Sequence, residues 1–299
     1  MPDLPIVDPH FHLWDLSFGK HPWLAKRPLD RSIAGDLAPL AVSYLLEDYL
    51  ADIKRQNVVK AVHIEAAWDP DDPVSETRWL QGVADRHGFP HGIVGRCRLH
   101  RPDAAQVLEG HAAHPNIRGI RQNLNWDKDP VRVMCERPDL LTDSAWREGF
   151  GRLNRHGFSF ELQLYAGQME DGARLARDFP DTQIILDHVG MPIDRDPEGL
   201  ALWRRGMRLL AEAPNIAVKL SGLGMVDWHW TVDSLRPFIL EAIDMFGLDR
   251  AMFASNFPVD KLYSSFDALY EAFKTIVAGF TEAERRKLFH DNAVRIYRL

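Results

Sequence analysis

Apolar and polar positions repeat along this chain with two alternating periods. Residues 6–13 alternate with the period of two that is typical of a β-strand, whereas Leu45, Tyr49 and Ile53 follow the spacing of one helix face. The two patterns take turns to the end of the chain. After the strand at 6–13 and the helix at 44–56, strands are predicted at 58–67, 92–99, 117–124, 158–165, 183–189, 216–220 and 251–256, and helices at 75–87, 102–113, 143–156, 168–179, 200–212 and 233–246.

Eight strands that alternate with helices predict parallel βαβ units, and eight such units close into a (β/α)8 TIM barrel of the α/β class. The chain has 299 residues and no linker-like segment, so we expect one domain over residues 1–299. A doubly wound open sheet is the competing fold, but no GxGxxG or GxxxxGK[ST] motif follows the first strand. Thr281 and Glu284 form a capping-box pattern, which predicts a C-terminal helix that ends near Tyr297.

Two connections, at residues 15–42 and 125–141, are too long to be simple turns. Long loops in compact domains often form lids or walls of functional sites. We therefore expect both loops to border a site.

Composition excludes several classes of function. Hydrophobic residues make up 45% of the chain, and 36 Lys and Arg stand against 43 Asp and Glu, a net charge of −7 that disfavours nucleic acid or anionic membrane as a partner. Cys97 and Cys135 form no CxxC motif, so neither a disulfide framework nor a zinc knuckle is predicted. No apolar run of about 18 residues and no signal-peptide core is present, so we expect a cytoplasmic protein.

The strand period predicts which polar side chains point into the barrel, where active sites form at the C-terminal strand ends. Asp8, His10 and His12 share one face of the first strand, and the other strands add His63, Glu65, Arg96, Arg98, Arg121, Asn123, Glu161, Gln163, His188, Lys219, Ser221 and Asn256. Buried polar groups must pair with each other or with a ligand. An internal ion network and direct function explain Arg96, Glu161 and Lys219 equally well. The positions at strand ends favour function for His10, His12, Arg121, His188 and Asn256.

The motif His10-Phe-His12 directs two imidazoles the same way. Neutral imidazole can bind a metal ion or hydrogen-bond a polarised carbonyl near neutral pH. The pattern is short, and two unrelated histidines on a half-exposed strand explain it equally well when it is taken alone.

The motifs together resemble the amidohydrolase superfamily, in particular its amidohydrolase-related branch with fuconolactone hydrolase and 2-pyrone-4,6-dicarboxylate lactonase. The resemblance implies a (β/α)8 barrel that hydrolyses sugar or aromatic-derived lactones. It also implies that two strand-one histidines, a strand-six histidine and a strand-eight aspartate surround the scissile carbonyl, with or without one divalent metal. The resemblance depends on Asp8-Pro-His-Phe-His12-Leu-Trp-Asp15, His21-Pro-Trp-Leu24, Gly119-Ile-Arg121, Asp187-His188-Val-Gly190, Lys219-Leu-Ser-Gly222 and Met252-Phe-Ala-Ser-Asn-Phe-Pro258.

Two positions depart from the family pattern. Gln163 stands where superfamily members commonly carry a strand-five histidine, and Asn256 stands where they carry the aspartate base. An amide cannot accept a proton from water as a carboxylate does, although it can orient water or substrate. A native Asn256 and an engineered replacement of aspartate explain the sequence equally well. A zinc site would keep only His10, His12 and His188 as ligands, so we expect either no required cofactor or one weakly held zinc ion.

We therefore expect a hydrolase that opens a small, anionic sugar-acid or catabolic lactone. His10, His12 and His188 would polarise the ring carbonyl, directly or through a metal. Arg121 would bind a substrate carboxylate or hydroxyls, because its planar fork suits bidentate binding. The expected further substrate contacts are Arg98, Gln163, Trp68 and Trp126, with Trp14 and Trp23 as other walls of the pocket.

Asp260 is the nearest carboxylate in sequence that could replace the missing base, and a helix cap explains it equally well. Two rival activities on the same scaffold are a lactone isomerase and a metal-dependent decarboxylase. A non-catalytic small-molecule binding protein is the rival from another class. The sequence predicts no macromolecular partner and leaves open whether the chain forms a homo-oligomer.

Overall fold

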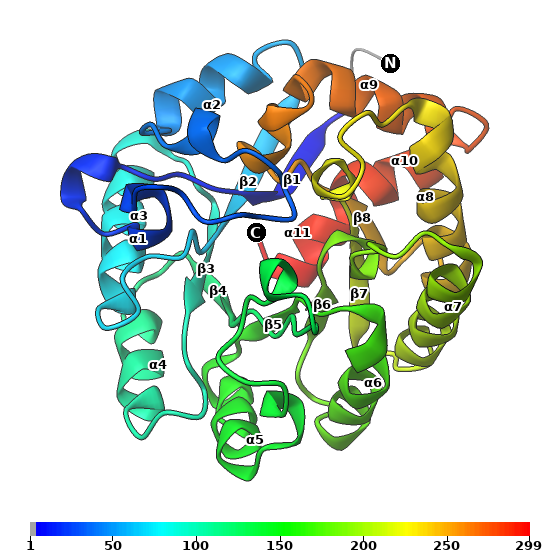
Figure 1. Cartoon of the computed structure of the whole chain (residues 1–299). Helices are drawn as coiled ribbons and strands as arrows, with labels where there is room; N and C mark the ends of the chain where they lie inside the picture. The colour runs from blue at the N-terminus through cyan, green and yellow to red at the C-terminus, as the bar shows by residue number, and fades with distance from the viewer. Residues whose placement is uncertain (1–3) are drawn as a thin grey trace.

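The computed structural model describes residues 4–299 and confirms the (β/α)8 barrel. Figure 1 shows the strands at the centre of a ring of helices. The strands are parallel and neighbour each other in chain order: β1 (Ile6–Phe11), β2 (Val58–Ile64), β3 (Gly92–Arg96), β4 (Ile117–Arg121), β5 (Ser159–Leu162), β6 (Ile184–Leu186), β7 (Ile216–Leu220) and β8 (Ala251–Phe253). The barrel closes just beyond β8 through two backbone hydrogen bonds. The backbone N–H of Asn256 donates to the His10 carbonyl at 2.8 Å, and the backbone N–H of His12 donates to the Phe257 carbonyl at 2.7 Å.

Helices connect the strands and cover the outside of the barrel (Figure 1). They are α1 (Pro22–Ala25), α2 (Leu46–Ile53), α3 (Pro73–His87), α4 (Ala104–Ala112), α5 (Ser144–Gly151), α6 (Met169–Asp178), α7 (Pro197–Ala211), α8 (Val232–Phe246), α9 (Phe266–Ile276), α10 (Glu282–Arg286) and α11 (Asn292–Tyr297). The predicted C-terminal helix is present as α10, a π-helical turn at Lys287–Asp291 and α11, and Thr281 and Glu284 cap its start. Within residues 4–299, no helix is both long and apolar enough to cross a membrane.

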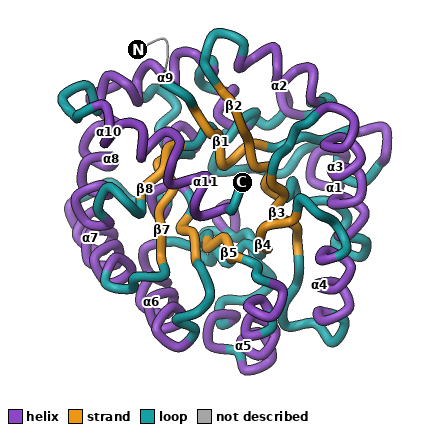
Figure 2. Tube along the Cα trace, turned by 180° about the vertical axis from the view of Figure 1, so that it is seen from behind, coloured by secondary structure: helices purple, strands orange, loops and turns teal. Residues whose placement is uncertain are grey.

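The C-terminal helix α11 closes the end of the barrel opposite the long loops, as Figure 2 shows from behind. Ala293, Ile296 and Tyr297 pack against an apolar layer inside the barrel, which consists of Val7, Val62, Ile64, Val94, Ile185, Ala217 and Met252. Apolar burial of this kind is the main stabilising term of a barrel interior. The polar side chains of the site lie above this layer.

The faces of β1 and β2 differ from the prediction. A register shift between Asp8 and Phe11 marks a bulge, so Asp8 does not share a face with His10. Asp8 points outward and accepts a hydrogen bond from Tyr49 of α2 at 3.0 Å. His63 also points outward, where its Nε2 accepts from the Leu13 amide at 2.8 Å.

Most predicted strands extend past the observed ones by two or three residues at their C-terminal ends. At these ends the backbone leaves the strand conformation: Ala67, His188 and Asn256 have positive φ angles of 53°, 55° and 59°. Non-glycine residues adopt this region at some cost and often near functional sites. The polar residues that follow the strands therefore lie at bends of the barrel mouth, where simple alternation no longer sets their direction.

Candidate active site

A cavity of about 320 Å³ lies at the C-terminal ends of the strands. All of its polar lining residues except Ser32 follow the strands and form its floor: His12, Arg121, Asn123, Gln163, His188 and Asn256. Its apolar lining residues come mostly from the loops and form its roof, among them Trp14, Trp23, Ile33, Leu37, Leu40, Met134 and Met225. The two long loops thus border the site, as the sequence predicted.

The tautomer of His12 is fixed by the backbone. Its Nδ1 lies 2.8 Å from the carbonyl oxygen of Ile64, and a carbonyl only accepts hydrogen bonds. The proton of His12 is therefore on Nδ1, and Nε2 carries the lone pair, on a residue that lines the cavity next to the side chain of Asn256.

His10 lies at the base of the floor, fully buried, with its ring 5.0 Å from that of His12 and 4.6 Å from that of His188. Its Nδ1 is flanked by the ammonium of Lys219 at 3.1 Å and by a carboxylate oxygen of Asp187 at 3.3 Å. With Lys219 as donor, the His10 proton is on Nε2; with Asp187 as acceptor, it is on Nδ1. The Nε2 atom is buried and has no hydrogen-bond partner among the described residues, and the His10 ring lies beneath the residues that line the cavity.

His188 completes the set of three imidazoles. Its Nδ1 lies 3.0 Å from the hydroxyl of Ser221, which follows β7. Burial lowers the pKa of His12 to about 4 and that of His188 to about 3, and it lowers the pKa of His10 well below the usual range. All three imidazoles are therefore neutral near pH 7.

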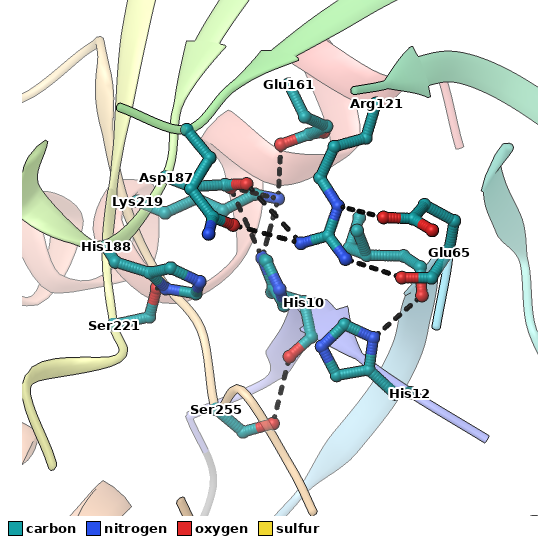
Figure 3. A network of polar contacts seen from close by, with 12 residues as sticks. His10, His12, Glu65, Arg121, Glu161, Asp187, His188, Lys219, Ser221 and Ser255 are labelled. Atoms are coloured by element: carbon teal, nitrogen blue, oxygen red, sulfur yellow. Dashed lines mark hydrogen bonds and ion pairs between the residues drawn. The ribbon is translucent and has the colours of Figure 1, made fainter. Parts of the chain in front are cut away.

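An ion network lies beneath the histidines and is drawn in Figure 3. The Lys219 ammonium, with a fully buried side chain, contacts Glu161 at 2.6 Å and Asp187 at 3.1 Å. The other oxygen of Glu161 accepts from the hydroxyl of Tyr297 on α11 at 2.6 Å. Burial raises the pKa of Glu161 to about 8, whereas Lys219 and His10 hold the pKa of Asp187 well below its usual range in spite of burial. For Glu161 and Lys219, the structure thus shows the internal network that was one of two interpretations of the sequence.

Arg121 lines the cavity, but its charge is balanced inside the protein. Its Nε donates to the Glu65 carboxylate at 2.8 Å, its Nη2 to the Glu65 carbonyl at 2.5 Å, and its Nη1 to Gln163 at 3.2 Å. Asp187 lies 3.8 Å from the same Nη1. The expectation of Arg121 as a free cation for a substrate carboxylate therefore loses its structural basis.

Asn256 and Asp260 lie on opposite sides of the cavity wall. Asn256 lines the cavity, and its Nδ2 has no hydrogen-bond partner among the described residues. Asp260 is buried behind it, next to Asn256 and the backbone of Gly222, and burial raises its pKa to about 7. Because Asp260 does not line the cavity, it is poorly placed to act as the base that the sequence suggested.

Three expected substrate contacts lie outside the cavity lining. Arg98 pairs instead with Glu136 at 2.7 Å. Trp68 is buried and stacks against Trp79, and Trp126 lies on a half-exposed part of the surface. Gln163 does line the cavity, as do Trp14 and Trp23, which were expected only as walls.

Asp187 is the site residue that sequence analysis missed. It follows β6 directly and contacts His10, Lys219 and Arg121 at the centre of the network. The signal was present in the strand period, because Ile185 points inward and Asp187 is two residues further on.

The donor set of the site fits a divalent ion. His10, Asp187 and His188 each offer a ligand atom, and these atoms lie within 4.8 Å of one another. The unpartnered Nε2 of His10 and the nitrogen and oxygen donors suit zinc. The set differs from the expected one because Asp187 takes the place of His12. Lys219 already contacts Asp187 and His10, so it would compete with an ion for both.

Known protein families and structures resemble this chain. The sequence profile of the amidohydrolase family matches residues 7–299. The chain belongs to the amidohydrolase family. It is 53% identical to the uncharacterized protein y4mH of Sinorhizobium fredii over the whole of both chains.

A more distant relative is the L-fucono-1,5-lactonase of Burkholderia multivorans, which is 27% identical over 98% of this chain and 96% of the relative. A crystal structure of an amidohydrolase from Burkholderia multivorans with bound zinc superposes with a TM-score of 0.81 at 25% identity, over 98% of this chain and 99% of that one. The resemblance to the lactonase branch of the family is thus confirmed.

Proposed function

We propose that this amidohydrolase hydrolyses a small lactone in the cavity at the mouth of the barrel. The observation that carries the proposal is the set of three neutral histidines, of which His12 lines the cavity and carries its lone pair on Nε2. The distant lactonase relatives support the reaction class. A carboxylate on the substrate is not part of the proposal, because Arg121 is already paired with Glu65.

In the proposed reaction His12 accepts a proton from water through Nε2, and the water oxygen adds to the lactone carbonyl carbon. The developing negative charge on the carbonyl oxygen is stabilised by the Nε2 proton of His10, in the tautomer that accepts from Lys219. The ring C–O bond then breaks, and the proton held by His12 passes to the leaving ring oxygen. The product is the open hydroxy acid.

Asn256 positions the reactants. The free Nδ2 of Asn256 can donate a hydrogen bond to the water or to the lactone, which an amide does without changing charge. Arg121 holds the side-chain amide of Gln163 in place through its Nη1, at 3.2 Å. A divalent ion, when bound by His10, Asp187 and His188, would supply Lewis-acid polarisation of the carbonyl.

The test is lactone hydrolysis by the purified protein, followed with a pH indicator, for wild type and His12→Asn. Loss of the base should lower kcat by about 10²-fold or more. His87→Asn is the matched control, because His87 is an exposed histidine at the end of α3. Equal activity of His12→Asn and wild type would show that His12 is not the base.

A further inference from the structure

We infer that the substrate is a lactone with an apolar substituent, and not a polyhydroxylated sugar lactone. This inference rests on the proposed function and concerns the part of the substrate that lies away from the reacting carbonyl. It starts from the uneven distribution of polar groups over the cavity described above. Polar side chains gather at the strand ends, and the roof above them is almost entirely apolar.

The apolar residues of the roof come from several separate loops. The β1–α2 loop places Ile33, Leu37 and Leu40 over the floor, the β4–α5 loop adds Met134, and the β7–α8 loop adds Met225. Such agreement between segments far apart in sequence is expected where they enclose an apolar part of a ligand.

The tryptophans of the wall add no polar group. The indole nitrogen of Trp14 donates to the Val42 carbonyl at 2.7 Å, and that of Trp23 donates to the Ala66 carbonyl at 2.9 Å. Both rings therefore offer only carbon atoms to the cavity. Ser32 is the single polar side chain of the roof.

Among the cavity-lining residues, the buried side-chain atoms without a protein partner belong to the floor, and the His10 ring lies directly beneath them. They are the Oδ1 of Asn123 and the Nδ2 of Asn256, and the Nε2 of His10 beneath them also lacks a partner. The amide of Gln163 is already engaged, since its Nε2 donates to Asn125 at 3.1 Å and its Oε1 accepts from Arg121 at 3.2 Å. The free groups are sufficient for a lactone carbonyl, its ring oxygen and a water molecule, but they lie away from the roof.

This arrangement selects between two kinds of lactone. A ring substituent with several hydroxyls would lose water against the roof and gain almost no hydrogen bonds, and each unpaired hydroxyl should cost about tenfold in kcat/KM. An alkyl substituent gains from burial, by about fourfold for each methylene until the cavity is full. A cavity of about 320 Å³ holds a six-membered lactone with a short chain.

The experiment compares kcat/KM for δ-valerolactone, δ-hexalactone, δ-octalactone and glucono-1,5-lactone, after subtraction of the uncatalysed rate. We expect kcat/KM to rise along the alkyl series, and glucono-1,5-lactone to be at least about 100-fold poorer than δ-octalactone. A preference for glucono-1,5-lactone would overturn the inference and leave the proposed function standing. Hydrolysis of none of the four, with no binding of any of them to His12→Asn in thermal-shift measurements, would remove both.

Variants of the roof locate the preference. Met134→Gln keeps the side-chain length and adds an amide, so it should lower kcat/KM for δ-octalactone by about tenfold and leave that for glucono-1,5-lactone equal or higher. Met245→Gln is the matched control, because Met245 is a half-buried methionine of α8 outside the cavity. Ile33→Asn repeats the test on another loop. Equal losses for both substrates in Met134→Gln and Ile33→Asn would overturn the inference.

Discussion

Replacing Lys219 with methionine removes the central cation of the network and keeps most of the side-chain volume. The ammonium has three donors and three partners: Glu161 at 2.6 Å, Asp187 at 3.1 Å and Nδ1 of His10 at 3.1 Å. All four side chains are fully buried, so water cannot replace the lost contacts. Asp187 then loses the cation that favours its ionised form, and Glu161, whose pKa is raised by burial, loses its ammonium donor.

Removal of one partner from a buried ion pair typically costs about 3–5 kcal/mol. We expect Lys219→Met to lower the free energy of unfolding by this amount, measured by urea unfolding followed through tryptophan fluorescence at pH 7. The change should also lower kcat by about 10²-fold, because His10 then donates its Nδ1 proton to Asp187 and loses the Nε2 proton that stabilises the oxyanion.

The double variant Lys219→Met/Glu161→Gln is the matched control. Glutamine still accepts from the Tyr297 hydroxyl but leaves no stranded charge at that position. The double variant should regain about half of the lost stability and none of the lost kcat, because His10 still has no donor at Nδ1. A stability loss below about 1 kcal/mol in Lys219→Met, or an unchanged kcat, would refute this account of the network.

Three further predictions concern the metal, Asn256 and Asp260. Zinc should bind weakly, at less than one ion per chain, and activity should survive chelation, because Lys219 lies 3.1 Å from the Asp187 carboxylate that an ion would use. Metal analysis and activity assays before and after EDTA treatment check this. One tightly held ion whose removal abolishes activity would contradict it. Asn256→Asp should leave kcat unchanged or lower, whereas a rise of ~10²-fold would mean that the site is built for the aspartate base of the family. Asp260 has a folded-state pKa of about 7, above its unfolded value, so its stabilising effect should be present at low pH and lost as pH rises from about 4 to 7. Asp260→Asn should abolish this pH dependence of the free energy of unfolding in urea and make the protein more stable than wild type at pH 8. If the same variant lowers kcat by ~10²-fold or more, Asp260 is the general base after all.

The fold could be predicted from the chain because hydrophobic periodicity is a local signal. Each strand and most helices showed their own period, although the helix α9 after β8 was not predicted, and alternating strands and helices of this number are compatible with few architectures. The same signal failed at β1, where the bulge after Asp8 turned that side chain outward. A bulge depends on the pairing of two strands and leaves little trace in the sequence of one.

The candidate site was predictable where a residue directly ends a strand. His12 and Arg121 are of this kind, and both line the cavity, as does His188 two residues past the end of β6. Arg98 and Trp126 were misplaced because their positions depend on loops. Arg98 pairs with Glu136, 38 positions further along the chain, and no local pattern predicts that contact.

The central claim is that water opens a lactone ring at the cavity floor, and isotope incorporation tests it most directly. The purified protein is incubated with δ-octalactone in ¹⁸O-water, and the product is examined by mass spectrometry at times when the uncatalysed reaction is negligible. The account predicts the open hydroxy acid with one ¹⁸O atom in its carboxylate, formed by wild type and by His87→Asn but not by His12→Asn. An unlabelled isomer, release of CO2, or a labelled product formed equally fast by His12→Asn would contradict it.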